Sequence, residues 1–141
     1  VGVYDTFRVT RSSAPLLERH LSRLESAARA LGLWPGPVDW ASTLAELARR
    51  NQLAEGVARI TLGDGFALLG LAPLPPELEA QRRLGIALST QRLERALAHL
   101  KSTSRLDLEL AEQRAGGEAL LVAASGSILE TTRANFFAIT A

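Results

Sequence analysis

The sequence has 141 residues, enough for one modest globular domain and too short for two full-sized ones. Hydrophobic residues make up 47% and charged residues 22%, which excludes a disordered or fibrous chain. The formal net charge of +1 argues against a domain that binds nucleic acid through bulk charge. No apolar run reaches the roughly 18 to 20 residues that span a membrane. The lack of cysteine excludes thiolate sites, and two histidines argue against a histidine-built metal centre.

The first half of the chain is expected to contain strands and helices in turn. The predicted elements are a strand at Val1–Thr10, a helix from Ser12–Pro15 to about Leu31 with serine as its cap, a helix at Trp40–Asn51 capped by Asp39, and strands at Gly56–Leu62 and Phe66–Ala72 around a tight turn. The prolines of residues 73–76 break this pattern and predict a domain boundary.

The second half mixes helix and strand signals. The predicted elements are a strand at Leu84–Thr90, a turn or short helix at Leu93–Leu100, a helix at Ser104–Ala115 with Leu106, Leu110 and Ala111 facing inward, and strands at Glu118–Ala124, Ser127–Leu129 and Ala134–Thr140. The fold class is therefore α+β, with two small lobes at residues 1–76 and 77–141. Since the last apolar strand needs partners on both sides, we expect the chain to be part of a longer polypeptide.

Lys101 is the only lysine in a chain that has fifteen arginines. A lysine amine can lose its proton and act as a nucleophile or base, which the arginine guanidinium cannot do. Lys101 follows an apolar segment, where a lysine can form a Schiff base. Codon bias would also leave few lysines, so composition alone leaves both interpretations open.

Three further charged residues are candidates for binding a ligand. Glu130 ends a predicted strand and could cap the next segment or hold a heteroaromatic nitrogen protonated. Arg23 lies one turn after His20 on the first helix and could bind phosphate, although most helical arginines are only solvated. Arg59 lies on a strand and could bind a substrate carboxylate or pair with a neighbouring acid. We expect His20 to pack against the sheet.

Four segments, taken in order, resemble the fold-type IV pyridoxal-phosphate enzymes of the class IV aminotransferase family. The segments are Gly2–Val9 (GVYDTFRV), Leu17–Ala27 (LERHLSRLESA), Leu100–Leu106 (LKSTSRL) and Ile128–Phe137 (ILETTRANFF). They are similar to the family's first strand, its first helix, its lysine segment and its glutamate segment. The resemblance covers nearly the whole chain. It implies the two-lobed fold of this family, without its N-terminal edge and its C-terminal part.

The resemblance implies a role for each candidate residue. Lys101 would form a Schiff base with pyridoxal 5'-phosphate and then carry the proton. Glu130 would pair with the pyridine nitrogen, Arg23 would bind the cofactor phosphate, and Asn135 would support the cofactor. Arg59 lies near the position of an arginine that binds the substrate carboxylate in some members. Two departures from the family pattern are Asp5 in place of glutamate and Thr131 in place of glycine.

Among the members of this family, the chain is most similar to the 4-amino-4-deoxychorismate lyases. Leu106 occupies the position at which branched-chain aminotransferases usually carry tyrosine. The expected reaction eliminates pyruvate from 4-amino-4-deoxychorismate and leaves 4-aminobenzoate for folate synthesis. A branched-chain or D-amino acid aminotransferase is the alternative. Either enzyme implies a small amino substrate, a cytoplasmic homodimer, and no nucleic-acid or membrane partner.

Two interpretations of other kinds remain open. The chain could be a non-catalytic dimeric interaction module in which Lys101 is incidental. It could also be a degenerate relative that binds the cofactor without turning over substrate. The enzyme is favoured because Lys101, Glu130 and Arg23 all fall where the family requires them.

Overall fold

A computed structural model describes residues 1–10, 14–95, 98 and 100–139. The chain forms two compact units, one of residues 1–78 with 99–103 and one of residues 79–98 with 104–141. Each unit holds helices and a three-stranded sheet, which confirms the α+β class. The segment at residues 99–103, which includes Lys101, packs with the first unit. The two lobes expected at residues 1–76 and 77–141, with their assigned roles in cofactor binding, stay a prediction.

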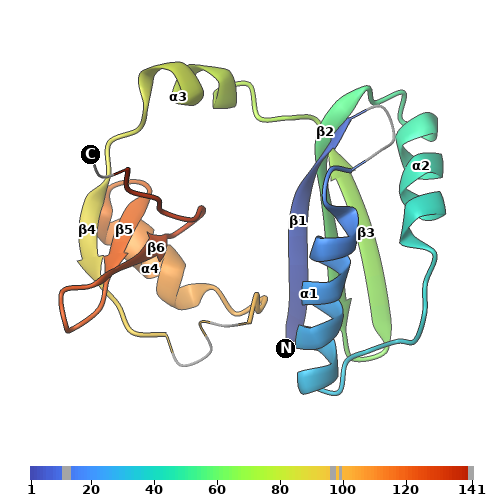
Figure 1. The fold of residues 1–141 in the computed structure, drawn as a ribbon, viewed down its shortest axis with the longest axis horizontal. Helices are drawn as coiled ribbons and strands as arrows, with labels where there is room; N and C mark the ends of the chain where they lie inside the picture. The colour runs from blue at the N-terminus through green and yellow to red at the C-terminus, as the bar shows by residue number, and fades with distance from the viewer. Residues whose placement is uncertain (11–13, 96–97, 99, 140–141) are drawn as a thin grey trace. The chain divides into compact units, whose positions relative to one another are not determined.

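The first unit is an antiparallel sheet with two helices. Its elements are β1 (Gly2–Thr10), α1 (Leu17–Ala30), α2 (Trp40–Arg50), β2 (Glu55–Gly63) and β3 (Phe66–Ala72), with strand order β1-β2-β3 (Figure 1). A tight turn at Asp64–Gly65 joins β2 to β3, and Gly65 has the positive φ of 74° that such turns favour in glycine. The predicted strands and helices of this half are confirmed, with small shifts at their ends.

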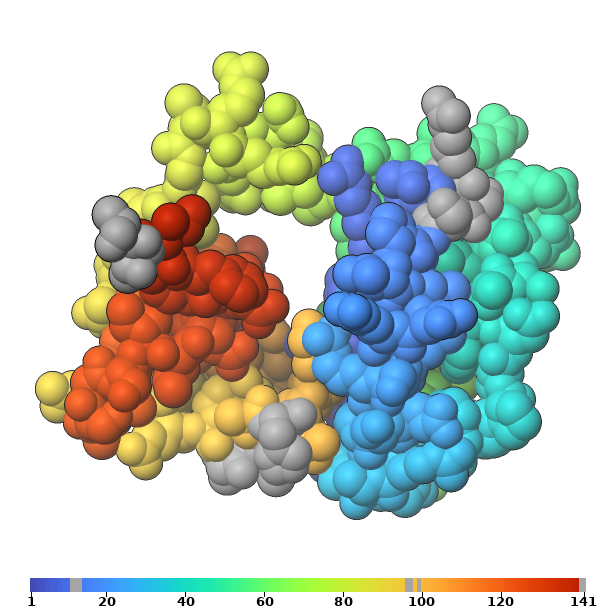
Figure 2. All heavy atoms as spheres, in the orientation of Figure 1, coloured from blue at the N-terminus to red at the C-terminus, as the bar shows by residue number. Residues whose placement is uncertain are grey.

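The core of the first unit lies between the sheet and its two helices. Alternate residues of the strands point toward the helices, where they pack with buried residues of α1 and α2. The buried set includes Val3, Phe7, Val9, Leu24, Ala28, Leu44, Ala58, Ile60 and Leu62. In Figure 2 the spheres of α1 and α2, blue to cyan, cover this side of the unit. The other face of the sheet carries Tyr4 and Arg59 together with exposed apolar side chains, among them Phe66 and Leu68.

The two helices of the first unit begin in different ways. Asp39 caps α2 as predicted, because its carboxylate accepts a hydrogen bond of 3.0 Å from Ser42 N. The start of α1 was predicted at Ser12–Pro15, and Ser12 and Ser13 lie outside the described residues. The helix begins only at Leu17, since Leu16 has a left-handed φ of 61° that no α-helix accommodates.

The second unit has a mixed sheet. Its elements are α3 (Leu78–Leu84), β4 (Ser89–Arg92), α4 (Leu106–Ala115), β5 (Ala119–Val122) and β6 (Ile128–Thr131), with β4 parallel to β5 and β5 antiparallel to β6 (Figure 1). Gly116, with φ 73°, ends α4. Across the described part of the chain, no helix is long and apolar enough to cross a membrane.

Two strand predictions in this half are wrong. The strand expected at Leu84–Thr90 is replaced by the end of α3 and the start of β4, because residues 78–84 are good helix formers and Gly85 turns the chain with φ 77°. The strand expected at Ala134–Thr140 does not form within the described residues 134–139. Residues 135–139 form no ladder with a described strand, and Thr140 lies outside the described residues.

The inward face of α4 also differs from the prediction. Leu108 and Ala111 are buried against β5, whereas Leu106 is 66% exposed and Leu110 is 40% exposed. Helical spacing alone allowed two apolar stripes on this helix, since leucine recurs at every second position from 106 to 110. The sheet selects the stripe that contains Leu108.

The packing of the first unit predicts unequal costs for two leucine truncations. Leu62→Ala should lower the free energy of unfolding by about 2 to 5 kcal/mol, because this fully buried side chain leaves a cavity. Leu68→Ala, on the neighbouring strand and 60% exposed, should cost less than about 1 kcal/mol. Urea unfolding of both variants beside the wild type measures the difference, and equal costs would contradict the assignment of the core face.

Candidate active site

Lys101 lies in a short segment that hydrogen-bonds to the free edge of β1. Val3 opposes Ser102 in an antiparallel bridge, and Tyr4 N donates a hydrogen bond of 2.8 Å to the Lys101 carbonyl. Leu100 and Ser102 are buried while Lys101 is exposed, and Ser102 N donates a hydrogen bond of 3.0 Å to the Leu100 carbonyl, which turns the chain at Lys101. The backbone of the lysine is therefore fixed by the sheet, and its amine reaches solvent.

Tyr4 and Arg59 share the face of the sheet that the helices do not cover, because both alternate with buried core positions of β1 and β2. The Arg59 guanidinium lies 3.8 Å from the centroid of the Tyr4 ring, a cation–π contact that holds an exposed arginine in place. The Arg59 guanidinium is thus presented on the face opposite the helices.

Asp5 is the one charged residue on the helix-covered side of β1, and its side chain is 1% exposed. Arg23 of α1 donates to both carboxylate oxygens, from Nε to Oδ2 and from Nη2 to Oδ1, each at 2.8 Å. His20, one turn earlier on α1, places Nδ1 3.2 Å from Oδ1 and packs its ring on Phe7 at 5.1 Å. The packing role expected for His20 fits these contacts.

The environment of Asp5 keeps its carboxylate ionised. Burial opposes ionisation and by itself would raise the pKa of Asp5. The hydrogen bonds and charge of Arg23, the charge of Lys101 and the hydrogen bond with His20 together outweigh burial and hold that pKa below its ordinary value. The same pairing raises the pKa of Arg23, chiefly through the hydrogen bond with Asp5.

The Arg23 guanidinium is held by Asp5 along one edge, and the rest of it faces solvent. Its side chain is 49% exposed, and Asp5 engages only Nε and Nη2. Its Nη1 donates to none of the described residues, so the arrangement leaves that nitrogen for an anion. A guanidinium fixed in this way suits a phosphate group, whose oxygens accept from such a fork.

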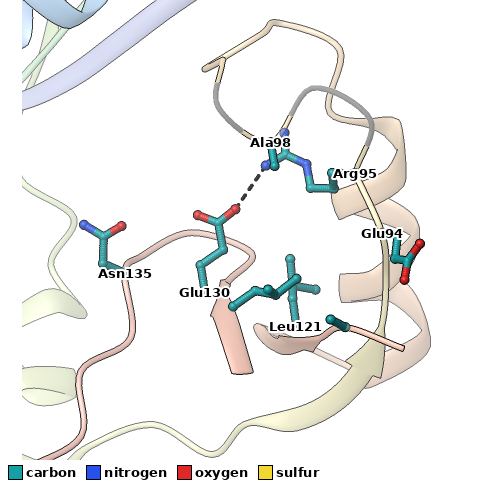
Figure 3. A pocket seen from close by; sticks show the side chains of 8 residues that line it. Glu94, Arg95, Ala98, Leu121, Glu130 and Asn135 are labelled. Atoms are coloured by element: carbon teal, nitrogen blue, oxygen red, sulfur yellow. Dashed lines mark hydrogen bonds and ion pairs between the residues drawn. The ribbon is translucent and has the colours of Figure 1, made fainter. Parts of the chain in front are cut away.

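Glu130 and Asn135 line a pocket of about 580 Å³ in the second unit. Glu130 lies on β6, and its carboxylate points toward Arg95, which donates a hydrogen bond of 3.1 Å from Nη1 to Oε1 (Figure 3). Among the described residues no helix begins after Glu130, so Glu130 caps no helix there. The pocket can receive a ligand beside this carboxylate.

The structure groups the predicted residues within each unit. Arg23, Arg59 and Lys101 lie in the first unit, and Glu130 and Asn135 lie around one pocket in the second. Sequence reasoning missed two contributors, Asp5 and Arg95. Asp5 carried a usable signal, because a carboxylate on the apolar side of an alternating strand requires buried partners. Arg95 carried none, since it lies in an irregular segment.

The Asp5–Arg23 pair predicts a pH-dependent stability difference between the wild type and Asp5→Asn. A carboxylate whose folded-state pKa is depressed stabilises the protein above its unfolded pKa, ordinarily 3.8, and loses that contribution as the pH falls through the folded value. Asp5→Asn should therefore cost about 1 to 3 kcal/mol near pH 7. The cost should shrink below about pH 4.

Urea unfolding at a series of pH values measures this difference. Asp64→Asn, the same change at an exposed turn, is the matched control and should be nearly neutral throughout. A cost for Asp5→Asn that stays constant down to pH 2.5 would contradict the ionised pair.

Comparison with known proteins places the chain among enzymes of one fold. A structure of 4-amino-4-deoxychorismate lyase from Pseudomonas aeruginosa is 28% identical, with a TM-score of 0.66, 93% of this chain covered and 56% of that chain. A protein provisionally assigned to the same enzyme class is 29% identical, with a TM-score of 0.80, 94% of this chain covered and 57% of that chain. The chain thus spans a little over half the length of these proteins.

A third structure shares the fold alone. It is a hypothetical aminotransferase from Mycobacterium tuberculosis with α-ketoglutarate and PMP bound, at 24% identity and a TM-score of 0.74, with 93% of this chain and 55% of that chain covered. A search of curated protein sequences finds no match. The model of the family described as amino-transferase class IV matches residues 2–141. The chain therefore belongs to the class IV aminotransferase family, whose fold-type IV architecture it shares.

Proposed function

We propose that the protein binds pyridoxal 5'-phosphate through Lys101 and eliminates pyruvate from 4-amino-4-deoxychorismate to give 4-aminobenzoate. The observation that carries the proposal is the setting of Lys101. The only lysine of the chain is exposed and is hydrogen-bonded through its backbone to β1, the strand whose Asp5 pairs with Arg23 of α1. This strand therefore brings a nucleophile and a candidate phosphate ligand into one unit.

The donor set fits the chemical groups of this cofactor. Its phosphate requires a cation with free N–H groups, which Arg23 offers at Nη1. Its aldehyde requires a primary amine, which Lys101 supplies. Its ring nitrogen requires a carboxylate, which Glu130 supplies beside Asn135 in a pocket large enough for a ring. When bound, the cofactor supplies an electron-poor ring that stabilises negative charge at the carbon bearing the substrate amine.

The residues of the chain have separate tasks in the elimination. Lys101 takes the proton from the substrate carbon that bears the amine. The bond between the six-membered ring of the substrate and the enolpyruvyl oxygen then breaks. The leaving enolate gains a proton and becomes pyruvate, so that one proton is lost by the substrate ring and one is gained by the leaving group. Glu130 keeps the ring nitrogen of the cofactor protonated. Arg59, held against Tyr4, binds the substrate carboxylate.

Two observations favour the lyase over an aminotransferase. Leu106 stands where branched-chain aminotransferases usually have tyrosine, and its side chain is 66% exposed. The two compared structures above 25% identity both carry the lyase name. An aminotransferase that acts on branched-chain or D-amino acids is the second candidate. We also propose that the enzyme acts as a homodimer, as the family resemblance implies.

The covalent role of Lys101 can be tested on the full-length protein by borohydride reduction with pyridoxal phosphate, followed by peptide mass mapping. Reduction should fix the cofactor on the Lys101 peptide, because hydride adds to the carbon–nitrogen bond between Nζ and the former aldehyde carbon. Lys101→Arg keeps the charge but cannot form this bond. It should lose the adduct and at least about 100-fold of turnover. An unmodified Lys101 peptide in folded protein would contradict the proposal and support the interaction module.

The choice of reaction can be tested by pyruvate release. Purified full-length enzyme should form pyruvate and 4-aminobenzoate in equal amounts from 4-amino-4-deoxychorismate without any added 2-oxo acid. The Lys101→Arg variant is the control for non-enzymatic release. Turnover that requires a 2-oxo acid, with no pyruvate from this substrate, would instead identify an aminotransferase.

A further inference from the structure

Arg95 links two carboxylates of the second unit from a nearly buried position. It lies in the irregular segment after β4, and its side chain is 13% exposed. Its Nε donates to Asp107 Oδ2 at 3.3 Å, and its Nη1 donates to Glu130 Oε1 at 3.1 Å. A guanidinium that donates in two directions from one plane fixes both acceptors relative to each other.

Asp107 gives this arrangement a rigid support. It is the second residue of α4, and its Oδ1 accepts a hydrogen bond of 2.9 Å from Leu108 N. The helix therefore holds Asp107, Asp107 holds Arg95, and Arg95 holds one oxygen of Glu130. The other oxygen, Oε2, accepts from none of the described residues, and Glu130 lines the pocket (Figure 3).

The charges of these three residues leave one negative charge unbalanced. Asp107 and Glu130 are carboxylates, and Arg95 is their common cation. A partly buried cluster with one net negative charge favours a ligand group that carries one positive charge and a hydrogen-bond donor. A protonated ring nitrogen has both properties.

We propose that Arg95 is a positioning residue that holds Glu130 so that Oε2 accepts from the protonated ring nitrogen of pyridoxal phosphate. This inference rests on the proposed function. Arg95 touches neither cofactor nor substrate in this role and acts through Glu130. Its removal leaves the Glu130 side chain free to rotate, so the carboxylate loses its fixed distance to the ring nitrogen.

A purely structural role for Arg95 is the alternative, because the same contacts join α4 to β6. The two roles differ in which ligand they affect. A structural cross-link would weaken the binding of every cofactor analogue to the same extent. A positioning role would weaken only ligands with a ring nitrogen, since only these need the carboxylate.

The test compares two ligands of the full-length protein, pyridoxal phosphate and an analogue in which a C–H group replaces the ring nitrogen. The measured quantity is the ratio of their dissociation constants, from absorbance titrations. The wild type should prefer pyridoxal phosphate, and Arg95→Gln should reduce this preference by about tenfold, the size of a lost charge-assisted hydrogen bond. Arg95→Lys should reduce it less. Arg92→Gln, at an exposed position on β4 outside the pocket, is the matched control and should leave it unchanged.

A second variant separates positioning from a direct effect. Glu130→Gln should lose the same preference, and the double variant Arg95→Gln/Glu130→Gln should lose no more than Glu130→Gln alone, because the arginine acts only through the glutamate. Arg95→Lys keeps the charge and serves if Arg95→Gln does not fold. An unchanged ratio in both Arg95 variants would overturn the positioning role. A wild type that binds neither ligand would overturn the proposed function and this inference with it.

Discussion

The paired carboxylate of Asp5 is the constraint on which the first unit depends. A charge this deeply buried is costly unless a partner satisfies it, and both of its oxygens are met by Arg23 of α1. The pair therefore fixes the position of α1 on β1. It also fixes the register of β1, since a slip of one residue would turn Asp5 to the open face and away from α1. Because the Lys101 segment hydrogen-bonds to the same strand, the position of the lysine depends on this register too.

In each unit a charged side chain is held in place by a more deeply buried partner of opposite charge. In the first, a buried carboxylate holds a guanidinium and leaves one of its nitrogens available. In the second, a nearly buried guanidinium holds a carboxylate and leaves one of its oxygens available. In both, the partner restricts a long side chain before any ligand arrives, so less conformational entropy is lost on binding. Under the proposed function, the partner residue is therefore as much a part of the binding arrangement as the residue that would contact the ligand.

The sequence predicted the elements whose signal is local. The β2–β3 hairpin and the Asp39 cap of α2 follow from turn and capping residues, and the structure contains both. Predictions that depended on distant partners were wrong at residues 134–139 and at Leu106, because pairing and packing with other segments decide the outcome there. The same reason explains the candidate site. Family motifs identified Lys101 and Glu130. Arg95 could be identified only from its contacts with Asp107 and Glu130, which lie 12 and 35 residues away in the chain.

The sign of the charges also bears on which group of the proposed cofactor each unit suits. Pyridoxal phosphate carries an anionic phosphate at one end and a basic ring nitrogen on the other side of its ring. In the first unit the predicted ligands have cationic side chains: Arg23, Arg59 and Lys101. In the second unit the cluster of Arg95, Asp107 and Glu130 has one net negative charge. Within the first unit a cationic group suits the anionic phosphate of the proposed cofactor, and within the second a net negative cluster suits a protonated ring nitrogen. In each unit, the held side chain sharpens this choice of ligand group because its charge stays in place.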